Sequence, residues 1–421
     1  MSEPSFLRVA IPFEGASPLG WLAGQDHAAK LYWASRDGDF EVAGVGVALR
    51  VDSLENAMLH LRDGDTERYF YGSMRFDDRR APDDIWGPFG KACFMLPAIE
   101  LRRVGNKCQL IGNGTYFDES QRDACIQSIH ENLDGVVRAN TSPTLALATV
   151  GPGTSFPDWP RWEQAIASCL TALEQRHLEK VVLARKKTYT FAHPKDASHL
   201  MQRLRESAPG AYHFCFQLGG ELAFLGASPE QLFMRDGLHI DTESLAGTRR
   251  RDVDEERDTE LANELQHSAK ECWEHDLVRQ QIESALHTLC IDHGVKDQRQ
   301  IIKLPNVQHL RTRFSGVLRE GISDEDIIDA MHPTSAVCGF PREKSFEPIA
   351  HYEQFDRGHY AGPVGYVGAK KSEFAVGIRS GLICGNQLHL FAGAGIVKGS
   401  QAKAEWDEID HKMRIWTRLL E

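Results

Sequence analysis

The chain has 421 residues, of which 42% are hydrophobic and 26% are charged, as in an ordinary soluble globular protein. Its net charge of −12, from 48 basic and 60 acidic residues, and the lack of a basic stripe argue against a nucleic-acid partner. Its length allows two or three domains, or one large α/β domain.

The sequence also indicates a compartment. The nine cysteines are scattered, odd in number and without a Cys-x-x-Cys spacing, which favours reduced thiols over disulfides or a zinc site. The first residues lack the basic and apolar regions of a signal peptide, and no apolar run reaches the roughly 20 residues of a membrane span. We therefore expect a cytoplasmic protein with no membrane partner.

Residues 1–150 alternate short strand-like runs with turns, and they show no catalytic constellation. We expect a helix over 118–133 and strands at 30–35, 40–51, 68–76, 92–104 and 107–111. The Gly- and Pro-rich stretch 151–160 is the clearest candidate for a linker. Within it, Asp158 is suited to cap a helix that runs to about His177.

The next predicted strand, 178–187, carries a lysine among apolar residues. A period of two places Lys180 on the same face as Val182 and Ala184. Such a lysine either reaches water past the end of the strand or is a desolvated amine with a lowered pKa. Residues 212–218 and 221–225 then form a hairpin around a Gly-Gly pair.

An acid follows this hairpin. Glu230 lies between Pro229 and the apolar run 232–234. It is either a solvated turn residue or a carboxyl whose pKa is raised by apolar surroundings, which suits a general acid. Residues 245–248 are a small-residue turn that would let a ligand approach the backbone.

Two pairs of glutamates lie beside buried helix faces. Glu271 and Glu274 project onto the apolar face of a long helix expected from about 258 to 289. Glu405 and Glu408 border the apolar stripe of the C-terminal helix, which follows a small-residue turn within 391–400. Either the acids form surface salt bridges, or the two pairs together form an oxygen-rich pocket that suits magnesium and does not suit zinc.

Two further polar residues stand in ambiguous places. His332 precedes a proline, which restricts it to extended geometry, so its simplest role is to shape the loop 331–341. Arg379 is expected in the middle of a strand over 374–382, where it either makes a structural ion pair or binds a ligand.

Taken together, the motifs in 160–421 resemble those of the chorismate-utilising enzymes, and most closely the isochorismate synthases. They are Lys180-Val-Val-Leu-Ala-Arg, Gly226-Ala-Ser-Pro-Glu, Leu245-Ala-Gly-Thr, Trp273-Glu-His-Asp-Leu, His332-Pro-Thr-Ser-Ala-Val-Cys-Gly-Phe-Pro, Tyr360-Ala-Gly-Pro-Val-Gly-Tyr, Ile378-Arg, Phe391-Ala-Gly-Ala-Gly-Ile-Val and Glu405-Trp-Asp-Glu. The likeness is weaker in the N-terminal part, where it rests on Leu31-Tyr-Trp and the run 37–46.

The resemblance implies a fold. It is a single large α/β (α+β) domain of two stacked, mainly antiparallel sheets surrounded by helices. Residues 1–150 would be its N-terminal part and 158–421 its catalytic region. The stretch 151–160 would then be a connection inside one unit.

The resemblance also implies roles for named residues. Lys180 would be the base that activates water, and Glu230 the acid that protonates the departing hydroxyl. Magnesium would be held by Glu274 and Glu408, with support from Glu271 and Glu405. Arg379 and Lys412 would contact substrate carboxylate. The remaining substrate-binding positions implied are Leu245, Ala246, Gly247, Thr248, His332, Ala336, Tyr360, Gly393, Ala394 and Gly395.

The reaction implied is the isomerisation of chorismate to isochorismate, in which water adds at C2 while the C4 hydroxyl leaves. Ammonia-using relatives usually lack the lysine and tend to have Thr at the position of Ala336, so amination is disfavoured. A salicylate synthase, which eliminates pyruvate from the same intermediate, and a chorismate-binding protein without activity are the alternatives. The run 357–362 resembles the menaquinone branch, and siderophore-pathway members are close. We expect no obligatory protein partner.

Overall fold

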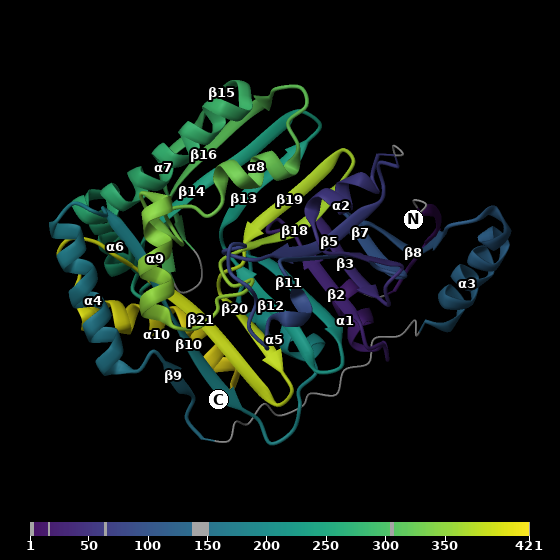
Figure 1. Cartoon of the computed structure of the whole chain (residues 1–421), viewed down its shortest axis with the longest axis horizontal. Helices are drawn as coiled ribbons and strands as arrows, with labels where there is room; N and C mark the ends of the chain where they lie inside the picture. Colours follow the sequence, from purple (N-terminus) through teal and green to yellow (C-terminus); the bar gives the residue numbers. More distant parts are fainter. Residues whose placement is uncertain (1–3, 16, 63–64, 137–150, 304–306, 421) are drawn as a thin grey trace.

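Two large antiparallel sheets carry most of the chain (Figure 1). The structure is a computed structural model that describes residues 4–15, 17–62, 65–136, 151–303 and 307–420. Buried side chains of both sheets join one hydrophobic core, which includes Trp33, Tyr71, Phe224 and Phe374. The expected fold, a single domain of two antiparallel sheets with helices around them, is confirmed.

Within the described residues, the larger sheet has twelve strands. In spatial order they are β1 (Ser5–Pro12), β8 (Lys107–Tyr116), β7 (Ile99–Val104), β3 (Phe40–Val45), β2 (Lys30–Ala34), β11 (Tyr212–Gly219), β12 (Leu222–Ser228), β20 (Ser380–Cys384), β21 (Gln387–Ile396), β10 (Lys180–Thr190) and β17 (Gly339–Phe340), with β9 (Thr154–Phe156) paired to β10.

The smaller sheet has nine strands in the part of the chain that the structure describes. Their order is β15 (Cys290–Lys303), β16 (Val307–Leu318), β14 (His239–Arg250), β13 (Gln231–Asp236), β19 (Lys371–Val376), β18 (Pro363–Gly368), β5 (Tyr69–Met74), β6 (Ala92–Leu96) and β4 (Leu49–Val51). The N-terminal part is built into both sheets, because β2 pairs with β11 in one and β5 pairs with β18 in the other.

Helices lie around the sheets, and α3 stands at the far end of the molecule from α4, α6 and α10 (Figure 1). Their bounds are α1 (Pro18–Ala23), α2 (Leu54–Leu59), α3 (Arg122–Gly135), α4 (Trp159–Glu174), α5 (Ala197–Ser207), α6 (Glu255–His267), α7 (Ala269–Leu289), α8 (Asp324–Met331), α9 (Arg342–Glu353) and α10 (Ala402–Leu420), with short 3₁₀ turns at Gly87–Phe89 and Glu119–Gln121.

Local sequence signals explain several of these elements. Asp158 caps α4 by accepting a hydrogen bond from the Arg161 amide, as expected, although the helix ends at Glu174. The predicted Gly-Gly hairpin joins β11 to β12, and both glycines have positive φ. On α10 the buried residues Ile409, Met413 and Trp416 recur at helical spacing.

Two long predicted strands are each divided between the sheets. The run 40–51 becomes β3 in the larger sheet and β4 in the smaller one, and the run 92–104 becomes β6 and β7 in the same way. The chain changes sheets at Gly46, with φ of 65°, and at the Pro97-Ala98 step. Short-range periodicity could not show this change, because both halves look equally strand-like.

The stretch 151–160 contains β9, which pairs with β10, and the start of the helix that Asp158 caps. Three other expectations were wrong. The helix 258–289 is two helices, since the Ser268 side chain caps α7 by accepting from the Glu271 amide. The turn 245–248 lies within β14, whose ladder has a bulge at Gly247. The strand 374–382 is interrupted, and Arg379 has φ of 53° between β19 and β20.

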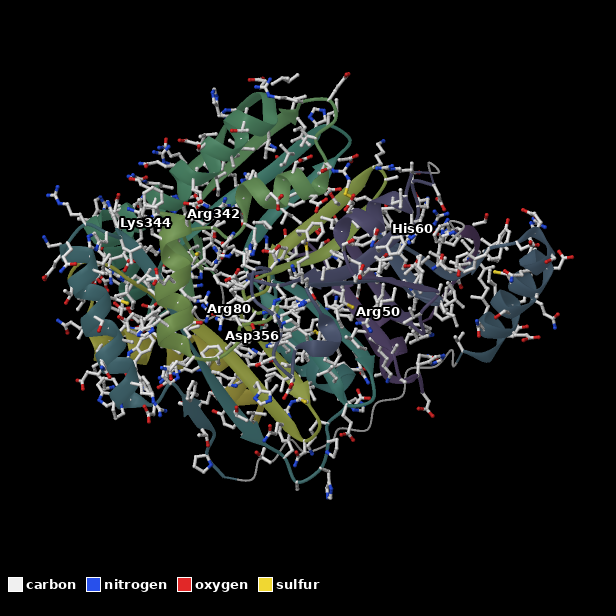
Figure 2. All side chains as sticks on the ribbon, in the orientation of Figure 1. Arg50, His60, Arg80, Arg342, Lys344 and Asp356 are labelled. Atoms are coloured by element: carbon white, nitrogen blue, oxygen red, sulfur yellow. The ribbon has the colours of Figure 1, made fainter. Side chains whose placement is uncertain are left out.

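A buried loop before β18 fastens the two parts of the chain together. Asp356, labelled in Figure 2, accepts hydrogen bonds from the Arg75 guanidinium at 2.7 Å and from the Asp83 amide at 3.0 Å. The Phe76 amide donates to the carbonyl of Gly358 at 2.9 Å. Gly358 has φ of 53°, and a Cβ atom there would lie 2.0 Å from the buried Trp86 ring.

Gly358→Ala should therefore destabilise the protein strongly. The left-handed backbone costs an L-residue about 1 kcal/mol, and the clash with a buried ring adds about 1–3 kcal/mol. Gly38→Ala is a matched control, because Gly38 has φ of 78° and open space around it, so it should show the backbone cost alone. Urea unfolding of the two variants measures the difference, and equal losses would contradict this account of the loop.

Candidate active site

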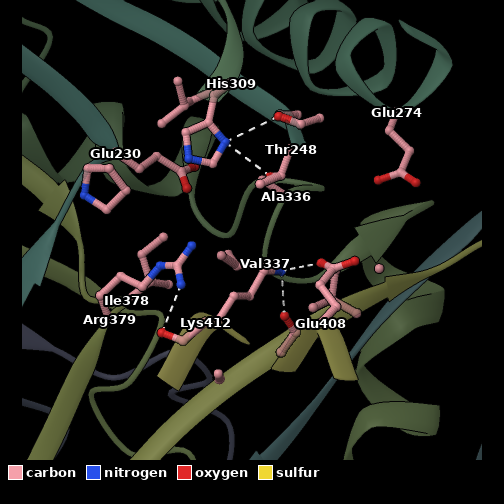
Figure 3. A pocket seen from close by; sticks show the side chains of 18 of the residues that line it. Glu230, Thr248, Glu274, His309, Ala336, Val337, Ile378, Arg379, Glu408 and Lys412 are labelled. Carbon is pink, nitrogen blue, oxygen red and sulfur yellow. Dashed lines mark hydrogen bonds and ion pairs between the residues drawn. The ribbon is translucent and has the colours of Figure 1, made fainter. Parts of the chain in front are cut away.

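A cavity of about 120 Å³ gathers residues from both sheets and from α7 and α10 (Figure 3). Fifteen of the eighteen residues that the sequence singled out line it. They are Lys180, Glu230, Leu245, Ala246, Gly247, Thr248, Glu271, Glu274, Ala336, Tyr360, Arg379, Gly393, Gly395, Glu408 and Lys412. Residues distant in the chain therefore converge on one space.

Lys180 begins β10 with its side chain inside the protein. Only 3% of that side chain is exposed, and Nζ lies 3.5 Å from the carboxylate of Glu274. The alternative in which Lys180 reaches water past the end of the strand is therefore wrong. The absence of a side chain at Gly395 on the neighbouring strand makes room for the amine, because a Cβ atom there would lie 2.8 Å from Lys180 Cε.

Glu230 lies at the end of the turn between β12 and β13. The Ser228 hydroxyl accepts from its amide at 3.3 Å, and its carbonyl accepts from Val376 at 3.0 Å. Burial, reinforced by the charge of Glu243, raises the pKa of Glu230 to about 8 against the opposing charges of Lys180 and Lys412. The carboxyl is thus protonated at neutral pH, and the solvated-turn reading is wrong.

Lys270, which was not predicted as a site residue, contacts one glutamate of each pair. Lys270 Nζ lies 3.4 Å from Glu405 on α10 and 3.9 Å from Glu274 on its own helix. Burial opposes its charge, but Glu405, Glu274, Glu271 and Glu408 together raise the pKa of Lys270. Lys270 therefore links the two helices, while Glu271 pairs with Arg249 at 2.6 Å and Glu408 pairs with Lys412 at 2.6 Å.

The chemistry of this cluster fits a divalent cation with oxygen ligands. Glu271, Glu274 and Glu408 line the cavity, and Glu405 is 3% exposed behind them. Burial and the charge of Glu408 raise the pKa of Glu405, as expected where negative charges are crowded. Within the described ranges, no three acidic, His or Cys side chains are already gathered as metal ligands. Two carboxylates completed by water and substrate oxygens are what Mg²⁺ takes.

Arg379 and Lys412 form a cationic wall. The Lys412 ammonium lies 2.6 Å from Glu408 and donates to the carbonyl of Gly393 at 2.8 Å. The Arg379 guanidinium donates to the Lys412 carbonyl, while the Trp416 indole donates to the Arg379 carbonyl at 3.0 Å. The guanidinium bonds to a backbone oxygen and makes no ion pair with an acid among the described residues, so its charge remains directed at the cavity.

His309, on β16, is a lining residue that the sequence reading missed. Its Nδ1 lies 3.0 Å from the Thr248 hydroxyl and 3.2 Å from the Gly247 carbonyl, which can only accept. Burial and the charges of Arg379 and Lys412 lower the pKa of His309 to about 3, so the ring is neutral. Nε2 is then an acceptor, and it finds no partner among the described residues.

Other lining residues are mostly apolar and were not predicted as site residues. They are Val182, Pro229, Lys270, Val337, Ile378 and Ala392. Conversely, three predicted positions do not line the cavity. His332 lies against Phe76, and the Nε2 atom of His332 is 3.3 Å from the Phe76 carbonyl. Ala394 is buried in β21, which continues to Ile396 instead of turning. Glu405 does not line the cavity but bonds to Lys270, which does.

The cavity places an amine and a neutral carboxyl around a space bounded by cations on one side and carboxylates on another. Glu230 and Glu274 lie on opposite sides of it in Figure 3. This arrangement can hold an anionic ligand, remove a proton at one end and supply a proton at the other.

Comparison with known proteins identifies the family of the chain. The family model described as chorismate binding enzyme matches residues 1–421. The chain is 36% identical to isochorismate synthase MenF of Escherichia coli (strain K12) over 98% of this chain and 93% of that protein. It is 32% identical to isochorismate synthase MenF of Bacillus subtilis (strain 168), over 82% and 73% of the two chains.

A solved structure is similar throughout. The menaquinone-specific isochorismate synthase MenF from Escherichia coli superimposes with a TM-score of 0.90 at 34% identity, covering 100% of this chain and 96% of that chain. The family model, the relatives and the fold all lead to one conclusion: the chain belongs to the chorismate-binding enzyme family.

Proposed function

We propose that the protein is an isochorismate synthase, an isomerase that adds water at C2 of chorismate while the C4 hydroxyl leaves. The observation that carries the proposal is the pairing of a buried amine, Lys180, with a carboxyl of pKa about 8, Glu230, in one cavity. The names of the relatives with which the chain aligns over nearly its full length support it.

In this reaction Lys180 takes a proton from the attacking water, and Glu230 gives a proton to the departing hydroxyl. The two groups act on opposite ends of one conjugated system, so that C–O bond formation and cleavage balance. The 3% exposure of Lys180 and the burial of Glu230 support the roles, since both groups act away from bulk water.

Cationic groups bind the substrate carboxylates in this proposal. Arg379 and Lys412 face the cavity, with the Tyr360 ring and the Gly393 backbone beside them. Leu245 to Thr248 on the bulged strand, and Ala336 opposite, shape the remaining wall. All lining residues fall between 180 and 412, which supports 158–421 as the catalytic region and 1–150 as the part that completes both sheets.

Magnesium is the proposed cofactor, held by Glu274 and Glu408 with Glu271 and Glu405 behind them. When bound, it would neutralise a substrate carboxylate and orient the ring. The convergence of Glu274 and Glu408 on one cavity supports this assignment, because Mg²⁺ takes one or two protein carboxylates and completes its shell with water and substrate oxygens.

Glu408→Gln should raise the magnesium concentration needed for half-maximal activity by about 10- to 100-fold, because one ionic ligand is lost. Asp407→Asn is the matched control, since Asp407 is the adjacent exposed acid on α10 and pairs with Lys403. The protective effect of Mg²⁺ against thermal unfolding gives a second readout that does not require turnover. An unchanged magnesium titration in Glu408→Gln would remove this residue from the metal site.

The decisive test of function is incubation with chorismate and Mg²⁺, followed by chromatographic separation of the products. Isochorismate alone supports the proposal. Salicylate with pyruvate as the main product would make the protein a salicylate synthase. No turnover would favour a chorismate-binding protein without activity.

The product is proposed to serve menaquinone synthesis rather than siderophore synthesis, because the similar Escherichia coli structure is menaquinone-specific. No helix within the described ranges is both long and apolar enough to span a bilayer. A cytoplasmic location is proposed on the scattered free thiols.

A further inference from the structure

A second cavity, of about 360 Å³, adjoins the catalytic cavity. The two share the residues Pro229, His309, Arg379 and Lys412. The wall of the second cavity continues outward along α10, the end of β14, the loop after it and the C-terminal end of α5. We call this second cavity the vestibule. The two cavities are therefore neighbours, with these four residues between them.

The vestibule is strongly basic in an acidic protein. Of the described residues that line it, six are Arg or Lys and one, Asp252, is acidic; the cations are Arg250, Arg251, Arg379, Lys412, Arg414 and Arg418. The whole chain has 48 basic and 60 acidic residues. The local excess is therefore opposite in sign to the net charge of −12.

Several of these cations form ion pairs. Arg251 lies 2.8 Å from Asp258, Lys412 lies 2.6 Å from Glu408, and Arg250 lies 3.8 Å from Asp252. Arg414 and Arg418 are exposed, one helical turn apart on α10. Their charges lower the pKa of His411 in the same wall, after the larger effect of burial, so that histidine stays neutral.

The two cavities also differ in the charges that line them. The vestibule is lined mainly by cations, whereas Glu271 and Glu274 line only the catalytic cavity. A dicarboxylate that approached Glu271 and Glu274 directly would meet negative charges as well as the cations Lys180 and Lys270. One that arrives through the vestibule moves along a row of positive charges, which ends at Arg379 and Lys412.

We propose that the vestibule is the route by which the anionic substrate enters, and that Arg414 and Arg418 speed its capture by long-range attraction. The identity of the substrate as the dicarboxylate chorismate rests on the proposed function. Neither arginine lines the catalytic cavity, so they act on arrival and leave the chemical step unchanged.

The test is the association rate of chorismate with the full chain, measured by stopped-flow tryptophan fluorescence. The double variant Arg414→Gln/Arg418→Gln should bind roughly three- to tenfold more slowly at low ionic strength. At about 0.01 M salt the screening length is about 30 Å, and at about 1 M it is about 3 Å, where the difference should nearly vanish. kcat should stay unchanged while kcat/KM falls.

A matched control removes the same charge elsewhere. Arg62 and Arg122 are exposed and lie in the N-terminal part, and α3, which begins at Arg122, stands at the opposite end of the molecule from α10 (Figure 1). Arg62→Gln/Arg122→Gln should leave the association rate within about twofold of wild type. Asp252→Asn removes a negative charge from the vestibule and should increase the association rate of chorismate by up to about twofold. A variant that fails to fold could not bind chorismate faster than wild type.

Equal association rates in the two double variants would overturn the proposed entrance. If wild type binds chorismate without forming isochorismate, the proposed function fails, while slower capture by the vestibule variant would still support the entrance. If isochorismate forms but charge removal at α10 has no effect at low salt, the entrance fails and the function stands. No binding of chorismate at all would overturn both.

Discussion

Lys180→Ala is expected to lower the rate of isochorismate formation by about 10²- to 10⁴-fold, because it removes the proposed base, which takes a proton from water. Binding of chorismate should change little, since the cationic wall of Arg379 and Lys412 remains. Steady-state kinetics with chromatographic detection gives the rate, and fluorescence titration gives the affinity.

Two comparisons separate a base from a packing residue. Lys180→Met keeps the bulk of the buried side chain and should be as inactive as the alanine variant. Lys187→Ala removes a half-buried lysine of the same strand and should keep full activity. Partial recovery of the alanine variant by added small primary amines would support proton abstraction by Lys180. Turnover near the wild-type level would exclude it.

Glu230→Gln should produce a loss of similar size, because the amide cannot protonate the departing hydroxyl. The pH dependence has a definite sign. With the pKa of the ligand-free protein at about 8, the carboxyl carries its proton below that pH and loses it above, so wild-type kcat/KM should fall as the pH rises through 8. The residual activity of Glu230→Gln should lack this alkaline decline.

Glu221→Gln is the control for this substitution, because Glu221 is exposed at the tip of the preceding hairpin. At neutral pH the native state of the wild type keeps Glu230 protonated, while an unfolded chain would ionise it, which costs stability. The amide removes that cost, so Glu230→Gln should unfold at a temperature no lower than wild type. A variant that is inactive because it is unfolded would fail this check.

Local patterns predicted the elements better than the way in which they assemble. The capped helix after Asp158 and the Gly-Gly hairpin were predictable, because each depends on residues within a few positions. The division of the strand-like runs at Gly46 and Pro97 was not, since it depends on which sheet each half joins. Propensity describes a residue and its neighbours but not the partner strand.

The site shows the same limit. The acids at 271, 274, 405 and 408 were conspicuous because carboxylates beside apolar helix faces are unusual. His309 was not, because one histidine in a strand looks like any half-buried polar residue, and only the folded chain places it beside Thr248. Lys270 adjoins Glu271 in the sequence, but its link to Glu405 spans 135 residues.

The position of Arg379 between the two sheets has a consequence for folding in the cell. β19 belongs to the smaller sheet and β20 to the larger one, and the short connection that carries Arg379 crosses from one to the other. Lys180 comes from the larger sheet and His309 from the smaller one. A partly folded chain with only one sheet formed therefore lacks half of the cavity and has no catalytic power. We therefore expect activity only after the two sheets have docked.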